Sequence, residues 1–195
     1  CTAKIHGYSG RFPSTHAQID CRDAGTVARF LLAACANQLG EFTIDGSARL
    51  RERPLCDLIE VLRLQGATLS SISLPLKINN THRLNGGLIS ISSHISSQFL
   101  SALLMIAPYC QTDVILTTKE LVSEPYVDMT RAMMKSFGVA VDKEEKVWRV
   151  NAGQFYQAKN YRIESDFSSA SYFFAAAAVT GGKITLLNMI RENSL

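Results

Sequence analysis

The sequence lacks long apolar runs and has no strong excess of charge of either sign. Among its 195 residues, apolar runs such as Phe30–Ala36 and Tyr172–Val179 fall far short of the roughly 18 residues that suggest a membrane span. Twenty basic against 17 acidic residues give a net charge of +3, which is too small to indicate nucleic acid as a partner. These absences predict a soluble protein that binds neither a membrane nor nucleic acid.

The sequence also lacks the cysteine and histidine patterns of metal sites and disulfide frameworks. Its five cysteines form no C-x-x-C pair, and its four histidines are scattered. Cys35 and Cys110 lie in apolar stretches, which is typical of buried, reduced thiols. We therefore expect a cytoplasmic protein with neither disulfides nor a bound metal. The chain opens on Cys1 without a Met or a signal peptide, and we expect it to be a piece of a longer protein.

What the sequence does contain is an internal repeat. Three helices that are apolar almost all round are predicted about 72 residues apart, at 23–36, 96–107 and 166–179. Two amphipathic helices alternate with them, at 53–65 and 124–137. Both have Pro near the start and Gly just past the end, as the chemistry of helix ends favours.

Short β-rich runs separate the predicted helices. They lie at 42–45, 88–91, 114–117, 147–150 and 183–187. The order of apolar helix, strand, amphipathic helix and strands then occurs about two and a half times. This predicts an α/β fold of repeated units, in which the apolar helices are buried, parallel and aligned with their N-termini at one end.

The N-termini of the apolar helices are rich in Gly, Ser and Thr, which suits the binding of an anion. Free backbone N–H groups and the helix dipole attract negative charge to such an end. Ser and Asp at these positions are equally typical of ordinary N-caps. Three such ends in register, with arginines nearby, favour a shared face for an anionic ligand.

Arginines precede the first amphipathic helix, where a guanidinium could bind a carboxylate or phosphate through two hydrogen bonds. Arg49 and Arg51 fit a solvated basic loop, whereas Arg53 directly precedes Pro54 and so has a restrained backbone. Ser123 lies at the equivalent place in the next repeat, and Tyr126, three residues later, is by itself more typical of packing.

A third group of polar side chains opens the second apolar helix. Ser96, Ser97 and Gln98 supply two hydroxyls and an amide there, beside free backbone N–H donors. This set suits a phosphate and neighbouring hydroxyl groups. It adds a second candidate anion site to the repeat.

Five motifs together resemble a known family. They lie at 23–29, 51–54, 96–99, 121–126 and 166–172, in an order and spacing similar to those of the enolpyruvylshikimate-phosphate synthases over nearly the whole chain. The resemblance implies carboxyvinyl transfer from phosphoenolpyruvate to shikimate 3-phosphate, on the route to chorismate and aromatic amino acids, without a cofactor. It also implies a fold of two similar lobes, each built of three βαβαββ-type units with inward helices.

The resemblance further implies roles for individual residues. Ser96, Ser97 and Ser123 resemble binders of the shikimate phosphate and its surroundings, and Tyr126 resembles a neighbour of that substrate. Gln98 resembles a residue that lies between the two substrates, and Arg53 an arginine that grips phosphoenolpyruvate. Gly25 resembles a backbone position that phosphoenolpyruvate, or the competing inhibitor glyphosate, approaches so closely that a side chain would crowd it.

The chain departs from the family pattern at three positions. Asp23 stands where many members have Asn, and we leave it out of the site because its charge would lie near an anion. Glu124 stands where Lys or Arg is common, and Ser165 where Gly is common. These differences concern local detail of the site.

Parts of the family's active site have no counterpart in the chain. They are an N-terminal Lys, Ser and Arg segment and the acid/base candidates and Lys and Arg clamp of the second lobe. We assign residues 1–164 to first-lobe units, the first of them truncated, and 165–195 to the crossover and the start of the second lobe. We place no catalytic residue in the chain and expect a monomer that, by itself, has no turnover.

Three alternatives stay open. A sibling carboxyvinyltransferase that acts on UDP-N-acetylglucosamine usually carries a reactive Cys shortly before its Arg-Pro pair; Ala48 is at the matching position, and Cys56 falls in the next helix. A relative that acts on RNA ends is disfavoured by the Ser-Ser-Gln and Ser-x-Pro-Tyr motifs and by the modest charge. A degenerate, non-catalytic module of the same architecture would have the same motifs.

Overall fold

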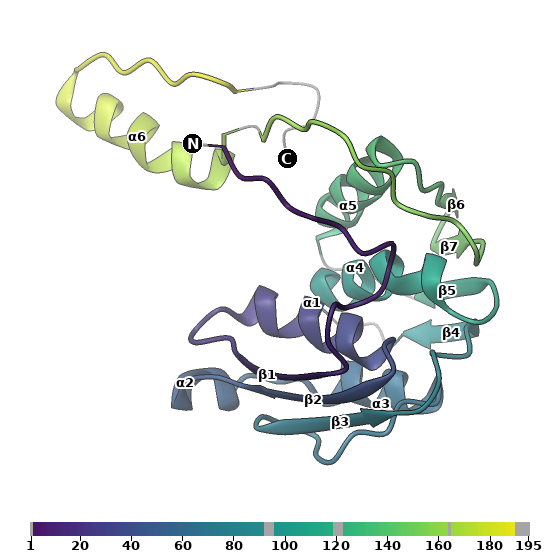
Figure 1. Ribbon diagram of the computed structural model, residues 1–195. Coiled ribbons are helices and arrows are strands. Elements are labelled where there is room, and N and C mark those ends of the chain that lie inside the picture. The colour runs from purple at the N-terminus through teal and green to yellow at the C-terminus, as the bar shows by residue number, and fades with distance from the viewer. Residues whose placement is uncertain (1, 92–95, 119–122, 164, 190–195) are drawn as a thin grey trace. The chain divides into compact units, whose positions relative to one another are not determined.

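The computed structural model describes residues 2–91, 96–118, 123–163 and 165–189. The chain divides into two compact units, Cys1–Ala158 and Lys159–Leu195. Among the described residues, the first unit holds the strands β1 to β7 and the helices α1 to α5, and the second holds α6 (Phe167–Thr180) (Figure 1). The α/β fold class predicted from the sequence is confirmed. That the first lobe ends at residue 164 stays a prediction.

The first unit begins with a three-stranded sheet and its helices. β1 (His16–Asp20) runs parallel to β2 (Gly40–Asp45), and β2 is antiparallel to β3 (Leu76–Asn80). One helix, α1 (Gly25–Ala36), links β1 to β2. Two more helices, α2 (Ala48–Arg51) and α3 (Cys56–Leu64), link β2 to β3, and an isolated antiparallel bridge joins Leu69 to Ile78 of β3.

A second half of the same unit repeats this plan. β4 (Gly87–Ile91) runs parallel to β5 (Val114–Thr118), and β7 (Val147–Val150) pairs antiparallel with both β5 and β6 (Asp142–Glu144). Helix α4 (Ser97–Ile106), with the short 3₁₀ turn η1 (Ala107–Tyr109) after it, links β4 to β5, and α5 (Glu124–Ser136) links β5 to β6. Each half thus begins with a parallel βαβ pair and continues through helix to antiparallel pairing, with β3 in the first half and with β6 and β7 in the second, in the order that the repeat predicts.

Two apolar helices, α1 and α4, pack against each other in the core and are parallel (Figure 1). Near their N-termini, Arg29 Nη1 donates a hydrogen bond to Gln98 Oε1 over 2.7 Å. At their other ends, Asn37 Nδ2 donates to the carbonyl of Ile106 over 3.3 Å. Because both bonds join like ends, the two N-termini lie at the same end of the core, as the repeat predicts. The third apolar helix, α6, belongs to the other unit.

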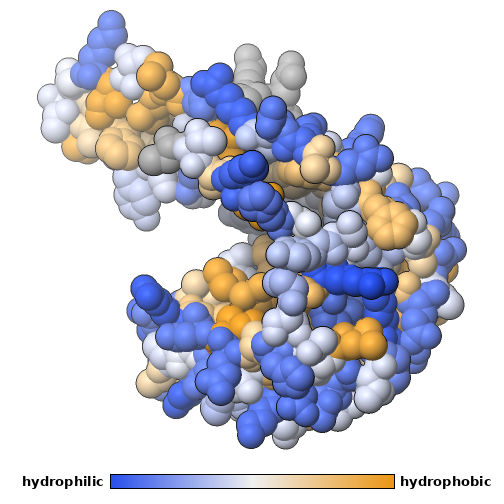
Figure 2. Space-filling view, in the orientation of Figure 1, coloured by the Kyte–Doolittle hydropathy of each residue, from blue (hydrophilic) through white to orange (hydrophobic). Residues whose placement is uncertain are grey.

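The prediction that α6 is buried on all sides is wrong for the chain as described. Only Ala170 of this helix is buried, while Tyr172, Phe173, Phe174 and Val179 are exposed. Figure 2 shows the resulting apolar surface over α6. The physical reason is that no other helix or strand is found in its own unit among the described residues.

The predicted strand at 183–187 is also wrong. A strand needs a partner that accepts and donates ladder hydrogen bonds, and no described residue pairs with this segment in a ladder. Ser165 donates to the carbonyls of Leu187 and Asn188, which fixes the end of the segment without forming a sheet. The predicted start of the helix at 53 is wrong by three residues, because Leu55 has a non-helical φ of −133° and α3 begins at Cys56.

Neither a membrane helix nor a clustered metal site occurs in the described part of the chain. Of the helices described, none has the length and apolar character to cross a bilayer. The described residues also hold no group of three His, Cys, Asp or Glu side chains that could bind a metal ion. The four described cysteines, Cys21, Cys35, Cys56 and Cys110, are free thiols; Cys1 lies outside the described residues.

Burial makes the thiol of Cys35 unreactive. Cys35 is fully buried in α1, and this burial raises the pKa of its thiol to about 12. Since the thiolate is the nucleophile, we expect no alkylation of Cys35 by iodoacetamide at pH 8 until urea unfolds the chain. The raised pKa also stabilises the fold fully below pH 9 and progressively less as the pH rises toward 12. Peptide mass spectrometry checks this; labelling of Cys35 in the folded chain as fast as in urea would contradict it.

Candidate anion site at the start of α1

The first turn of α1 lies against two arginine side chains. A Cβ added at Gly25 would be 2.7 Å from Arg53 Nη1 and 3.0 Å from Arg29 Nη1. Gly25 is buried, and both arginines are half-buried. Two guanidinium groups from different segments therefore meet at one helix N-terminus.

This N-terminus differs from those of the other apolar helices because no side chain caps it. Ser96 caps α4 by accepting a hydrogen bond from the N–H of Gln98 over 3.3 Å, and Asp166 caps α6 in the same way. The N-cap of α1 is Ala24, whose side chain has no acceptor. The first N–H groups of α1 thus have no side-chain acceptor, and they add to the positive charge of the arginines.

The two arginines lack a negative partner within the described residues. Neither Arg29 nor Arg53 is in an ion pair with a carboxylate there. Burial lowers the pKa of Arg29, and the nearby charge of Arg53 lowers it further. Since each cation disfavours the other, an anion bound between them would be stabilised by both.

The charged neighbours of this site are engaged elsewhere. Arg51 donates from Nε and Nη2 to both carboxylate oxygens of Asp45, at 2.8 and 2.7 Å, and this bonding lowers the pKa of Asp45. Asp23 accepts a hydrogen bond from the hydroxyl of Ser47, the N-cap of α2. Arg53 is the arginine of this loop that contacts Gly25.

The polar side chains at the start of α4 lie beside this site. Gln98 is joined to it by its hydrogen bond to Arg29. Ser96 caps the helix, and Ser97 is buried in the first turn. The structure thus brings the predicted residues of α4 to the same end of the core as Gly25 and Arg53.

Ser123 and Tyr126 are connected to α4 one turn further along. The hydroxyls of Ser101 and Thr130 lie 2.8 Å apart, and Thr130 Oγ1 donates to the carbonyl of Tyr126. Ser123 has a left-handed φ of 66°, which costs a residue with a side chain about 1 kcal/mol. In the described part of the chain, no hydrogen bond joins the side chains of Ser123 or Tyr126 to Gly25, Arg53 or Gln98.

Arg29 was not predicted as a site residue from the sequence. A signal was present, because Arg29 is the only charged residue of α1. A charged side chain in a helix that is otherwise apolar must find polar partners when the helix is buried. The partner, Gln98, is 69 positions away in the sequence. The apolar pattern of a single helix cannot show which distant residue will be that partner.

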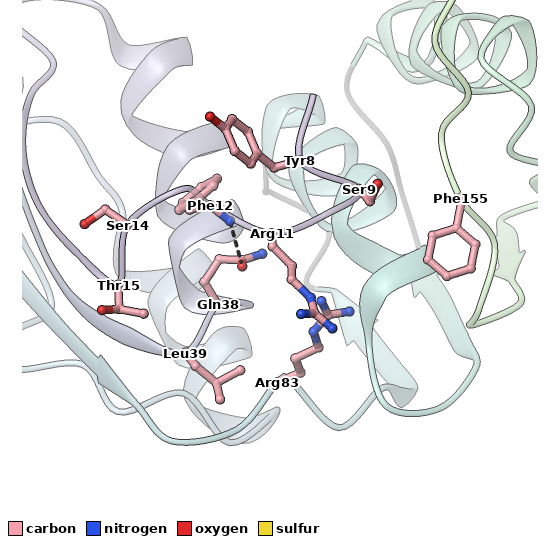
Figure 3. Close-up of a pocket in the computed structure, with 10 residues that line it drawn as sticks. All are labelled: Tyr8, Ser9, Arg11, Phe12, Ser14, Thr15, Gln38, Leu39, Arg83 and Phe155. Atoms are coloured by element: carbon pink, nitrogen blue, oxygen red, sulfur yellow. Dashed lines mark hydrogen bonds between the residues drawn. The ribbon is translucent and has the colours of Figure 1, made fainter. Parts of the chain in front are cut away.

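A separate hollow of about 790 Å³ lies near the opposite end of α1 (Figure 3). Its lining includes Arg11 and Arg83, and none of the predicted site residues. Gln38, two residues after α1, accepts a hydrogen bond from the N–H of Phe12 and donates to the carbonyl of Gly10. The N-terminal segment thus forms part of the wall of this hollow, which is distinct from the anion site.

Comparisons with known proteins all point to one family. The family model for EPSP synthase (3-phosphoshikimate 1-carboxyvinyltransferase) matches residues 1–194. A 3-phosphoshikimate 1-carboxyvinyltransferase of Nostoc sp. (strain PCC 7120) is 42% identical over 196 residues, which cover 97% of this chain and 46% of the relative. One from Shewanella pealeana is 42% identical over 189 residues, covering 93% of this chain and 44% of that relative.

Two further comparisons extend this result. The Pentafunctional AROM polypeptide of Malassezia globosa is 36% identical over 212 residues, covering 98% of this chain and 13% of the relative. An EPSP synthase structure from Acinetobacter baumannii matches 86% of this chain and 37% of its own with a TM-score of 0.71. At 24% identity, that likeness shows the fold. The chain spans about half the length of the single-function relatives that it matches.

Proposed function

The chain belongs to the EPSP synthase family, and we propose that the full-length protein containing it transfers a carboxyvinyl group from phosphoenolpyruvate to shikimate 3-phosphate. Phosphate is released, and the product leads to chorismate and the aromatic amino acids. The activity belongs to the full-length protein, a cytoplasmic monomer that needs no cofactor. The chain by itself binds substrate weakly and has no turnover.

One observation carries this proposal: the uncapped N-terminus of α1 between Arg29 and Arg53. Both proposed substrates are anions, and the site offers backbone N–H donors and two guanidinium groups without a carboxylate partner among the described residues. Arg53 and the backbone at Gly25 hold phosphoenolpyruvate.

The first turns of α4 and α5 hold the other substrate. Ser96, Ser97 and Ser123 bind the phosphate of shikimate 3-phosphate and its surroundings, and Tyr126 lies beside it. Gln98, which Arg29 connects to the start of α1, lies between the two substrates. The hydroxyl pair of Ser101 and Thr130 supports this arrangement by joining α4 to α5.

The site residues of the chain bind and orient; they do not transfer protons. Carboxyvinyl transfer requires a proton for the methylene carbon of phosphoenolpyruvate and removal of one from the attacking hydroxyl. The charged groups beside Gly25 are arginines, which stay protonated at neutral pH. We assign the acid and base to the rest of the full-length protein, where a closed site would also exclude water.

The sibling reaction on UDP-N-acetylglucosamine has less support. Ala48, at the position of the reactive Cys, is the first residue of α2, and it has no thiol. Cys56 begins α3, where its Sγ lies 3.7 Å from a carboxylate oxygen of Asp57. The remaining alternative is a non-catalytic module of the same architecture. An assay of carboxyvinyl transfer by the full-length protein distinguishes this module from the proposed enzyme.

A titration of shikimate 3-phosphate into the chain, followed by amide NMR, tests the proposed site. We expect shifts at Ser96, Ser97, Gln98 and Ser123, with further shifts at Gly25 when phosphoenolpyruvate is added. The same samples should release no phosphate, whereas the full-length protein should release it only when both substrates are present. A folded chain without shifts, or a full-length protein without turnover, would contradict the proposal.

Replacing Gly25 by Ala should weaken binding of phosphoenolpyruvate without unfolding the protein. The new Cβ would meet the end of the Arg53 side chain at 2.7 Å, and this flexible side chain can move aside at little cost in stability. Moving Arg53 disturbs a charged hydrogen bond worth roughly 1.5 kcal/mol or more, so that KM for phosphoenolpyruvate should rise about tenfold. Steady-state kinetics of the full-length protein measure this. Gly7→Ala, where nothing lies within 4 Å, is the control, and an unchanged KM in Gly25→Ala would count against the site.

A further inference from the structure

We propose that Arg29 is a positioning residue that orients the side-chain amide of Gln98 toward the bound substrates. The proposal rests on the proposed function, because it takes the anion at the start of α1 to be a substrate of that reaction. Arg29 acts through Gln98, and Gln98 is the group that contacts the ligand.

The chemistry of the two side chains decides the orientation of the amide. A guanidinium only donates hydrogen bonds, whereas the Gln amide has one accepting oxygen and one donating NH₂ group. The oxygen of Gln98 must therefore face Arg29, and Nη1 of Arg29 donates to it over 2.7 Å. The NH₂ group is then left to donate to phosphate or carboxylate oxygens. Without Arg29 the amide could turn by about 180° and point its oxygen at the anion.

The position of Arg29 is itself fixed by both core helices. Its guanidinium carbon lies 5.4 Å from the centroid of the Phe99 ring, which suits a cation–π contact. The same Nη1 that bonds Gln98 would be 3.0 Å from a Cβ at Gly25. Its Nε is buried and has no hydrogen-bond partner among the described residues. Burying the Nε donor without a partner costs free energy. An arginine kept in place despite this cost, with its one side-chain hydrogen bond to Gln98, suits a residue that orients its neighbour.

A double-mutant cycle in the full-length protein tests whether Arg29 acts through Gln98. Arg29→Met and Gln98→Met should each lower kcat/KM for phosphoenolpyruvate by about 10- to 100-fold, as expected for a hydrogen bond to a charged group. If Arg29 works through Gln98, the double variant should be within about twofold of Gln98→Met. Losses that multiply would overturn the proposal, since Arg29 would then act independently, for example through its charge alone.

Gln98→Glu keeps the experiment decisive if Arg29→Met fails to fold. Glu still accepts from Arg29 and has the same size, but it has no NH₂ group and carries a negative charge. We expect a melting temperature within a few degrees of the unaltered protein and a kcat/KM no higher than that of Gln98→Met. A Gln98→Glu protein with near-normal kcat/KM would overturn the proposal. Arg49→Met, which removes an exposed arginine of α2, is the control and should change little.

The failure of this proposal can be told apart from failure of the proposed function. If the unaltered full-length protein has no carboxyvinyl transfer, the proposed function fails at the first assay. The pairing is then tested by NMR of the Gln98 side-chain amide, whose two N–H chemical shifts should change in Arg29→Met, because the amide oxygen loses its bond to Arg29, and should stay the same in Arg49→Met. Identical signals in Arg29→Met and the unaltered protein would mean that Arg29 does not orient Gln98.

Discussion

From the proposed function, we expect Arg53→Ala to lower kcat/KM for phosphoenolpyruvate by at least about 100-fold in the full-length protein. Arg53 contacts Gly25 and is in no ion pair with a described carboxylate, so that its charge is available to the ligand. Two charge-assisted hydrogen bonds, worth roughly 1.5–3 kcal/mol each, would be lost. The rate of phosphate release, measured at varied concentrations of phosphoenolpyruvate, gives kcat/KM for the variant and the unaltered protein.

The stability of the same variant should not fall. Arg53 lowers the pKa of Arg29, which means that the two cations repel each other, and removing Arg53 relieves that repulsion. The melting temperature should therefore stay constant or rise slightly, while activity is lost. Arg49→Ala is the matched control, because Arg49 is exposed. Combining Arg53→Ala with Ser97→Ala and finding carboxyvinyl transfer unchanged would refute the assignment of this site.

Asn37→Ala should destabilise the protein by roughly 2–5 kcal/mol. The side chain is 1% exposed, and it donates to the carbonyl of Ile106 and accepts from the N–H of Leu84 over 3.0 Å. Alanine would leave the buried N–H of Leu84 without its partner and the carbonyl of Ile106 with only the weak 3.8 Å bond from the Cys110 thiol, and each unsatisfied buried group costs about 1–3 kcal/mol. Asn37 also joins the C-terminal ends of α1 and α4, so its loss should loosen the alignment of the two helices at the site.

Urea unfolding of the chain, followed by circular dichroism, measures this loss. Asn79→Ala is the matched control, because Asn79 is exposed on β3 and surface changes are usually within about 0.5 kcal/mol. If Asn37→Ala lowered the free energy of unfolding no more than Asn79→Ala does, the interpretation that Asn37 holds α1 against α4 would be wrong.

The helices were more predictable than the strands, and the reason is the strength of the local pattern. α1, α4, α5 and α6 lie within a few residues of the predicted ranges, since apolar periodicity with Pro and Gly at the ends is a local signal. β1, β3 and β6 were not predicted. The run of β3, Leu76–Asn80, holds only two apolar residues, which is a weak strand signal. β1 alternates between exposed and only half-buried residues, and β6 consists of Asp, Lys and Glu, so neither has the apolar alternation by which a strand is identified.

The sequence by itself determined the α/β repeat, the family resemblance and the candidate residues Gly25, Arg53 and Ser96–Gln98, because these depend on composition, spacing and motifs. Only the tertiary structure decided which of them meet. It placed Arg53 against Gly25, left α1 without a side-chain cap and joined Arg29 to Gln98. The physical reason is that a site is made of contacts between residues far apart in the chain, and helix packing, rather than any local pattern, brings those residues together.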